Sequence, residues 1–434
     1  MAISIGIVIG IGIFRVPSDV AKYLPFGGLI LLAWFLGGII SLSGALCYAE
    51  LAAMYPETGG DYAFLRRAYG HLIAFLFAWT ELLVIRTGSI AAVSYLFSGY
   101  ACALLGVDKA MMRPLAIGIG MLLGAINVMG LNVGRKLQNT LSLTKVAAIL
   151  LLISGAAVVG HGNVCHLTGL PQEAPSLNLV SSFLLALIPI LWTYGGWQES
   201  VFVAGETKNA GKTLPFALTG VVFVVSSLYI LANAVFLYLI PPDRLVNSTE
   251  IAADVLKLLY GGVSSKILEV LVVISAIGSI NAMLIIGSRI TYAMAHDVPL
   301  FKVFASESSD SKAPVRALGL NVAGACIFIL LGTFERLLFF TGIAVWLFFA
   351  LVVASVFVFR IRNPAIRRPF VVPLYPWLPA CFIFVCVSLC LNTLWIYPRE
   401  SLLGLALVAS GIPVFCLSQY LVRKGILKQD GPKS

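Results

Sequence analysis

The sequence has 434 residues, of which 60% are hydrophobic and only 11% are charged, with a net charge of +10. Soluble domains carry about 25% charged residues, so a mean hydropathy of +0.99 excludes a water-soluble protein. The positive charge does not indicate nucleic-acid binding, because the basic residues fall mainly in alternate short loops between apolar runs. The composition indicates a polytopic membrane protein with the lipid bilayer as its solvent.

Apolar stretches long enough to cross a bilayer, about 20 residues each, recur along the whole chain. They predict an all-α protein with about twelve transmembrane helices, and since no basic residue precedes the first run, we expect the first helix itself to be the insertion signal. The expected spans are residues 2–24, 27–54, 71–105, 112–130, 138–159, 178–205, 213–240, 266–296, 315–332, 336–360, 371–395 and 402–422.

The first span contains an unusual run of glycines. In "IGIVIGIGIFRVP", residues 5–17, Gly6, Gly10 and Gly12 lie near its centre. Each glycine weakens a helix by about 1 kcal/mol relative to alanine. The run predicts a helix that opens in the middle of the membrane.

The sixth span contains a second interruption, in "LIPILWTYGGWQES", residues 187–200, where Pro189 is followed by Gly195 and Gly196. Spans one and six are five apart, so a five-plus-five repeat places the two breaks at equivalent positions. Paired, glycine-interrupted spans point to the substrate site of a transporter. Close packing of small residues is the alternative for either break alone, but the matched positions favour a binding site.

Several stretches resemble one family. "GIVIGIGIFRVP" resembles the glycine-rich first-helix motif of the amino acid–polyamine–organocation superfamily, and "WTYGGWQE" resembles the sixth-helix motif of its L-type amino acid transporter branch. Residues 48–70, 80–89, 203–215 and 278–301 are similar to further stretches of that branch.

The resemblance implies a LeuT-type fold. In this fold two inverted five-helix repeats, here residues 1–159 and 178–360, precede two additional helices at 371–422 and a tail at 423–434. Helices one and six are unwound at mid-membrane, through the break glycines Gly10, Gly12, Gly195 and Gly196.

The resemblance also implies the contacts of an amino acid substrate. Its carboxylate is expected at the amides of Ile11 and Gly12, where a half-helix presents free N–H groups. Its ammonium is expected at the carbonyls of Val8, Trp192 and Gly195, with the Trp192 ring as a gating aromatic and Gln198 as a polar contact. Ile11 replaces the family's usual serine and Trp192 its usual phenylalanine. These departures indicate a small or reshaped pocket, a non-standard substrate, or two changes that are tolerated because the backbone makes the contacts.

Lys145 lies in the middle of the fifth span. A buried ammonium costs several kcal/mol unless it has a partner, so we treat it as functional; a lysine that reaches to the membrane interface is the alternative. It matches the lysine that replaces a bound sodium ion in sodium-independent members of the superfamily. The expected partners are carbonyls near residues 8–10 with Ser275 or Ser279, which share a helix face.

Other charged residues lie near or within the spans, and we expect structural or gating roles for them: Arg15, Glu50, Glu81, Arg86 and Arg289. Glu81 and Arg86, five apart, are too poorly phased on an α-helix to pair. Glu50 is expected to pair with Arg66 or Arg67, and Arg15 and Arg289 to lie toward the membrane faces.

Other motifs carry no function. "GETKNAGKT", 205–213, has the wrong spacing for a phosphate loop, and His161, Cys165 and His166 lack zinc-site spacing. Asn247 begins a glycosylation sequon that matters only in a secretory-pathway host. No hydrolase or metalloprotease motif occurs, so we expect no enzyme, metal or cofactor.

The basic residues predict the topology and bear on partners. With the first helix entering from the cytoplasm, the cytoplasmic loops and tail hold about twice as many cations as the outside loops. The protein is therefore expected in the cell membrane with both termini on the cytoplasmic side. The loop 106–114 contains no cysteine. The heavy subunit that is disulfide-linked to animal L-type members is therefore not expected.

These observations predict sodium-independent amino acid transport by alternating access, most simply as an exchanger of small or medium neutral amino acids. A proton-coupled symporter and an antiporter of cationic amino acids or polyamines remain open within transport. A nutrient sensor with the same pocket is the alternative from another class.

Overall fold

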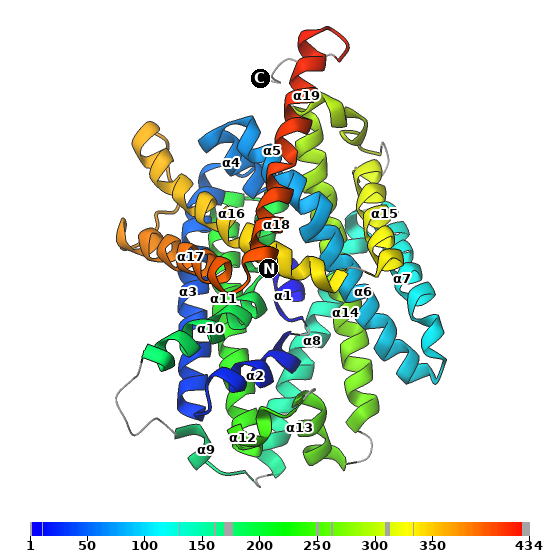
Figure 1. Ribbon diagram of the computed structural model, residues 1–434, viewed down its shortest axis with the longest axis vertical. Coiled ribbons are helices and arrows are strands. Elements are labelled where there is room, and N and C mark those ends of the chain that lie inside the picture. The colour runs from blue at the N-terminus through cyan, green and yellow to red at the C-terminus, as the bar shows by residue number, and fades with distance from the viewer. Residues whose placement is uncertain are drawn as a thin grey trace.

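The structure of the protein, a computed structural model, describes residues 2–10, 12–129, 131–159, 162–168, 177–248, 251–261, 264–308, 313–332 and 334–427. Within these ranges the regular elements are helices. One isolated antiparallel bridge joins Thr58 to Val203, both of which lie between helices. The molecule is elongated, and most of its longest helices run along the long axis (Figure 1).

The helices of the first half follow one another with short connections. They are α1 (Ala2–Val8), α2 (Gly12–Tyr23), α3 (Gly27–Met54), α4 (Asp61–Tyr69), α5 (His71–Thr80), the π-helical segment η1 (Glu81–Ile85), α6 (Arg86–Leu105), the 3₁₀ turn η2 (Lys109–Met111), α7 (Met112–Val128), α8 (Leu131–Val159) and α9 (Cys165–Thr168).

The second half begins with another interrupted helix. Its elements are α10 (Leu177–Tyr194), the 3₁₀ helices η3 (Trp197–Phe202) and η4 (Ala204–Glu206), α11 (Ala210–Leu239), α12 (Pro242–Leu245), α13 (Ile251–Tyr260), α14 (Ser264–Asp297), η6 (Pro299–Phe304), α15 (Val315–Leu331), α16 (Phe334–Arg362), α17 (Trp377–Ile396), α18 (Pro398–Ala409) and α19 (Gly411–Arg423).

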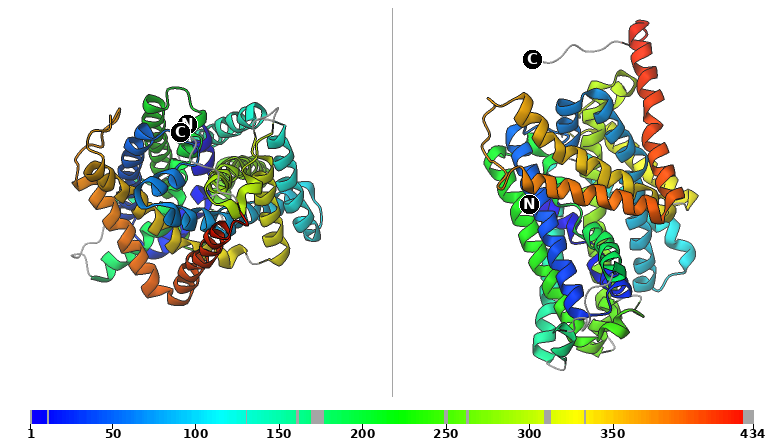
Figure 2. Two further views of the ribbon diagram at one scale, coloured as in Figure 1. Left: turned by 90° about the horizontal axis from the view of Figure 1, so that it is seen from above. Right: turned by 60° about the vertical axis from the view of Figure 1, so that its left-hand side comes forward.

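Ten helices of the described residues are long and apolar enough to cross a membrane. Val315–Leu331 is apolar but, at 17 residues, shorter than all of them, and residues 2–23 are divided between α1 and α2. The short elements α9, α12 and α13 gather at one end of the long axis, and α4 and the end of α19 lie at the other (Figures 1 and 2).

Prolines explain two differences from the expected spans. The eleventh span begins at Trp377 instead of residue 371, because Pro373 and Pro376 cannot continue a regular helix backward. The last span is interrupted after Ala409, since Pro413 lacks the amide that would bond to the carbonyl four residues earlier. Helix α8 begins earlier than expected, at Leu131, because helical geometry extends beyond the apolar part of the span.

The helices pack as two groups around the broken segments. Helix α11 packs along α3, and α10 packs against α2 and α3. Helices α6, α7, α14 and α15 pack on one another around a separate small core that includes Ile90, Leu123 and Leu284. Helix α1 lies between the groups, in contact with α8, α14, α11 and η3.

Candidate functional site

Residues 2–23 of the expected first span are divided into two helices. Helix α1 ends at Val8 and α2 begins at Gly12. At the break the Gly10 amide donates to the Val8 carbonyl at 2.7 Å, a tight turn in place of the helical bond. The first amides of α2 have no intrahelical acceptor and can bind an anion. Ile11, the other predicted amide donor, lies outside the described residues.

The second break is at Gly195 and Gly196. Helix α10 ends at Tyr194, and η3 continues from Trp197. Gly196 has φ +106°, and a β-carbon there would lie 2.5 Å from Ile7 Cγ2 of α1. Only glycine combines this backbone with so close an approach, so the second break packs directly on the first half-helix.

The predicted contact residues of the second break have defined local roles. The Trp192 carbonyl accepts from the Gly195 amide at 3.0 Å, and the Trp192 side chain is 60% exposed. Gln198 is buried, and its Oε1 accepts from the Gly196 amide at 3.2 Å. Gln198 thus holds the turn of the second break together.

Tyr229 of α11 joins the two breaks, a role that no pattern in the sequence indicated. Its hydroxyl donates to the Val8 carbonyl at 2.5 Å and lies 3.5 Å from the Thr193 carbonyl. The Val8 oxygen therefore already accepts from Gly10 and from Tyr229, which occupies both of its lone pairs. A buried tyrosine in an apolar span carries no sequence signal that separates it from a core aromatic.

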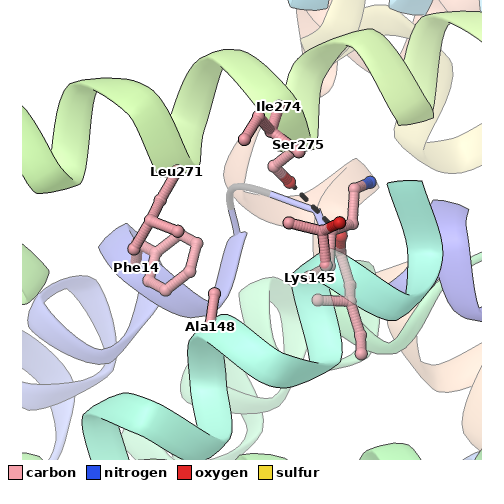
Figure 3. Close-up of a pocket in the computed structure, with 8 residues that line it drawn as sticks. Phe14, Lys145, Ala148, Leu271, Ile274 and Ser275 are labelled. Carbon is pink, nitrogen blue, oxygen red and sulfur yellow. Dashed lines mark hydrogen bonds between the residues drawn. The ribbon is translucent and has the colours of Figure 1, made fainter. Parts of the chain in front are cut away.

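Lys145 of α8 is buried and reaches the first broken helix. Its Nζ donates to the Gly6 carbonyl at 2.5 Å and to Ser279 Oγ of α14 at 3.0 Å. Ser275 Oγ donates instead to the Ile9 carbonyl at 3.4 Å, the bond drawn as a dashed line in Figure 3. The amine thus contacts the Gly6 carbonyl, in the middle of α1. The acceptors expected from the sequence were carbonyls near residues 8–10, at the end of α1 and in the break.

Gly6 has a different role from the one its place in the glycine run indicated. It lies within α1, and a β-carbon there would come within 2.6 Å of Ser142 Oγ and closer still to the Gln138 amide. The absence of a side chain lets α1 lie directly on α8, which brings the Gly6 carbonyl to Lys145.

A small cavity adjoins Lys145. Its volume of about 10 Å³ is enough for about one water molecule, and Figure 3 shows residues of α2, α8 and α14 around it. In this conformation it has no room for an amino acid. Its lining residues are Ile9, Phe14, Thr144, Lys145, Ala148, Leu271, Ile274 and Ser275.

Arg86, Glu81 and Glu199 form a buried charge cluster, which corrects the expectation that Glu81 and Arg86 do not pair. Arg86 Nε donates to Glu81 Oε2 at 3.1 Å, and the guanidinium NH groups donate to Glu199 of η3 at 3.2 and 3.3 Å. Residues 81–85 form a π-helical turn, whose wider winding brings residues five apart into line. The cluster therefore ties α6 to η3.

A further expectation about charged residues is wrong. Glu50 pairs with Arg360 of α16 at 2.6 Å and lies 3.6 Å from Arg368, instead of pairing with Arg66 or Arg67. Arg289 is 3% exposed and donates to the Ile285 carbonyl at 2.6 Å, whereas Arg15 is exposed.

The outer-loop candidates contribute little. Cys165 is exposed, and His166 Nδ1 is 3.1 Å from the Leu237 carbonyl; His161, and Thr249 of the sequon, lie outside the described residues. In the part of the chain that the structure describes, His, Cys, Asp and Glu form no group that could hold a metal ion.

Two helices broken at facing positions, inside a bundle of apolar membrane-spanning helices, define a secondary transporter. A family model for amino acid permeases matches residues 1–416. The chain belongs to this family, in the amino acid–polyamine–organocation superfamily, and its relatives are of the L-type branch.

Three relatives illustrate the similarity. The chain is 28% identical to the serine/threonine exchanger SteT of Bacillus subtilis (strain 168), over 96% of this chain and 94% of that protein. It is 29% identical to the b(0,+)-type amino acid transporter 1 of Rattus norvegicus, over 96% and 86%. It is 30% identical to the large neutral amino acids transporter small subunit 2 of Mus musculus, over 100% and 82%.

Proposed function

We propose that the protein exchanges small or medium neutral amino acids across the cell membrane, independently of sodium, by alternating access. The observation that carries this proposal is the pair of facing breaks at Gly10 and Gly196, with the Lys145 ammonium bonded to the half-helix α1. Family membership and the exchanger and transporter relatives support it.

The proposed architecture is the LeuT-type fold with twelve spans. Ten apolar helices, together with Val315–Leu331 and the α1–α2 pair, are consistent with that number. The two repeats would be residues 1–159 and 178–360, followed by helices at 371–422. The group of α3, α10 and α11 would move against the group of α6, α7, α14 and α15, because each group packs mainly within itself.

Lys145 would take the place of a sodium ion. It is 4% exposed and donates to α1 and α14, so one fixed cation holds together the elements that a bound ion would bridge. Ser275 would support the same junction through the Ile9 carbonyl. A transporter that carries this cation covalently has no need for external sodium.

The charges beside the breaks favour a neutral substrate. Arg86 is bonded to Glu81 and Glu199, and Lys145 to a carbonyl and a hydroxyl. A charged substrate side chain would have to break one of these buried pairs, which costs several kcal/mol. A neutral side chain needs no such exchange.

The substrate's own charged groups would bind to the backbone. Its carboxylate would meet the amides of Ile11 and Gly12 at the start of α2. Its ammonium would meet the carbonyls of Val8, Trp192 and Gly195. Because Tyr229 and Gly10 occupy the Val8 oxygen in the present conformation, binding would release at least one of these bonds.

The orientation and partners follow from the sequence. The basic loops support a cytoplasmic location for α4 and both termini. Three of the loop and tail cations, Lys312, Lys428 and Lys433, lie outside the described residues. Because the loop 106–114 contains no cysteine, we propose that the transporter works without a disulfide-linked subunit.

The test is uptake of radiolabelled alanine into proteoliposomes in sodium-free buffer, with and without unlabelled amino acids inside. Uptake that requires internal amino acid supports exchange. Uptake into empty vesicles under an inward proton gradient would replace exchange by proton symport. If a broad panel of amino acids produced no uptake under either condition, the proposal would be wrong and a sensor would become the better reading.

A further inference from the structure

The loop that leads into helix α4 is docked onto the second broken helix. Thr58 forms an antiparallel bridge with Val203, directly after η3, and the Gly59 amide donates to the Phe202 carbonyl at 3.2 Å. The Ser200 amide of η3 in turn donates to the Ser4 hydroxyl oxygen of α1 at 3.1 Å. The docked loop therefore meets the C-terminal end of η3, close to the Ser200 amide that bonds to the half-helix α1.

Asp61, the first residue of α4, is buried in this docked arrangement. Its side chain is almost inaccessible, at 3% exposed for the residue, and Oδ2 accepts from the Tyr48 hydroxyl of α3 at 3.0 Å. Oδ1 is buried without a hydrogen-bond partner among the described residues. An ionised carboxylate at such a site loses its hydration and regains only one hydrogen bond, which costs several kcal/mol.

The charges nearest to Asp61 do not compensate it. Glu199 of η3 and Glu81 of η1 face it with the same charge, and Arg86, the cation nearby, is already bonded to both glutamates. Three carboxyl groups thus share one guanidinium. If all were ionised, this buried region would carry an excess of two negative charges.

The other elements that pack on α4 leave this balance unchanged. From α14, Asp297 is bound by Arg66 and by the Tyr62 hydroxyl, at 2.9 Å each. From α16, Arg362 donates to the Ala68 carbonyl at the far end of α4. Burial raises the pKa of the Asp61 carboxyl well above its usual value, Glu199 and Glu81 raise it further, and the Tyr48 bond and Arg86 oppose the rise.

We propose that Asp61 is a proton-binding site: when the loop before α4 is docked on the second broken helix, the Asp61 carboxyl group holds a proton, and release of that proton to water favours undocking of the loop and the start of α4. A cavity of about 150 Å³ lies next to α4, lined by Tyr62 and Ala63 of α4 and by residues of α14, and Asp61 is not part of its lining. The proton therefore exchanges with water when the docked arrangement opens. That undocking opens this side of the transporter rests on the proposed function.

The direction of the pH effect follows from the burial. When α4 is undocked and Asp61 is exposed, its pKa is about 3.9, and in the docked state the pKa is higher. Docking is therefore most stable below about pH 3.9 and weakens as the pH rises through the docked pKa. Between the two values the docking equilibrium changes by about tenfold per pH unit for one proton.

Hydrogen–deuterium exchange of the full-length protein in lipid nanodiscs tests this without any substrate. The readout is protection of residues 55–65, corrected for the intrinsic pH dependence of exchange, between about pH 5 and about pH 8. We expect wild-type protection to fall as the pH rises. In Asp61→Asn, which is neutral at every pH, protection should stay high and independent of pH.

Two further variants make the result specific. Tyr48→Phe removes a donor that favours the ionised form, so the transition should move upward by about one pH unit. Glu57→Gln neutralises the loop carboxylate that pairs with Arg66 and Arg67, so it should change protection by the same factor at every pH and preserve the wild-type transition.

Three outcomes would overturn the proposal: wild-type protection that does not change with pH, a transition that persists in Asp61→Asn, or a transition that Tyr48→Phe moves downward or leaves in place. If Asp61→Asn does not fold, Tyr48→Phe decides alone. Because docking is measured without transport, an error in the substrate assignment would leave the result unaffected.

Discussion

The position of α1 against α8 and α14 depends most directly on Lys145. Its ammonium bonds to the Gly6 carbonyl and to Ser279. Lys145→Met keeps the length of the side chain and removes both bonds. Hydrogen bonds to charged groups contribute about 1.5–3 kcal/mol, so we expect alanine exchange in proteoliposomes to fall by about tenfold or more.

Serine variants calibrate this prediction. Ser279→Ala removes one of the two acceptors and should reduce exchange less than Lys145→Met does. Ser154→Ala, on the exposed face of α8, removes only a local bond to the Leu151 carbonyl and should leave exchange unchanged. Wild-type exchange in Lys145→Met would refute the structural role assigned to the amine.

The Arg86 cluster makes a prediction about the order of stabilities. Arg86→Met leaves Glu81 and Glu199 buried without a cation, and breaking a buried pair in this way costs about 3–5 kcal/mol. Glu199→Gln leaves Arg86 bonded to Glu81 and should cost less. We expect the apparent melting temperature in detergent to fall in the order wild type, Glu199→Gln, Arg86→Met.

Two controls separate charge balance from packing. The triple variant Arg86→Met, Glu81→Gln, Glu199→Gln removes the unpaired charges and should recover much of the loss. Asp19→Asn breaks the exposed pair with Lys22, and exposed pairs contribute at most about 1 kcal/mol. If Arg86→Met were no less stable than Asp19→Asn, the cluster would not be a structural tie.

At the scale of helices, the two breaks could be predicted from the sequence and their packing could not. Gly10, Gly12, Gly195 and Gly196 are poor helix formers in apolar runs, which is a local property. Gly6 belongs to the same run, yet it lies inside α1. A glycine is needed there because Gln138 and Ser142, distant in sequence, leave no room for a side chain. Tyr229 likewise joins the breaks from a span with no local signal.

The π-helical segment η1 shows the same limit. On a regular α-helix, residues five apart point in different directions, so the spacing of Glu81 and Arg86 argued against a pair. The wider turn at residues 81–85 aligns them, and Glu199 from η3 completes the cluster. A π turn is set by tertiary contacts as much as by the local sequence.

Gly196 provides the prediction for the break itself. Gly196→Ala places a β-carbon against Ile7 on a backbone with φ +106°, and such strain costs about 1–3 kcal/mol. We expect lower thermal stability and slower exchange. Adding Ile7→Ala should recover part of the loss, since it restores room but not the preferred backbone.

A glycine in a regular helix serves as its control. Gly118→Ala lies in α7, where a β-carbon meets nothing within 4 Å. Alanine there should be neutral or stabilising by about 0.5–1 kcal/mol. If Gly196→Ala behaved like Gly118→Ala, the close approach of the two breaks would not constrain the protein.

At the scale of the molecule, the sequence predicts the helices because each span is a continuous apolar run, which lipid requires of any membrane-crossing segment. It does not predict which charges meet. Glu50 pairs with Arg360 and Arg368, more than 300 residues away, although Arg66 and Arg67 are far closer along the chain. Such pairs depend on which helices the fold brings together.

The orientation in the membrane is the remaining property of the whole molecule, and Cys165 tests it. This cysteine is exposed on α9, at the end of the long axis opposite α4 (Figure 1). Six of the other seven lie in the ten long apolar helices, and Cys326 lies in the shorter apolar helix Val315–Leu331. With both termini inside, a charged, membrane-impermeant maleimide should label Cys165 in intact cells, and Cys165→Ser should abolish the labelling.

In the Cys165→Ser background, Lys424→Cys at the end of α19 should react only after permeabilisation. The two cysteines lie at opposite ends of the molecule, so labelling of Lys424→Cys but not of Cys165 in intact cells would mean the reverse orientation. The proposed proton-binding residue Asp61 would then lie at the outer face.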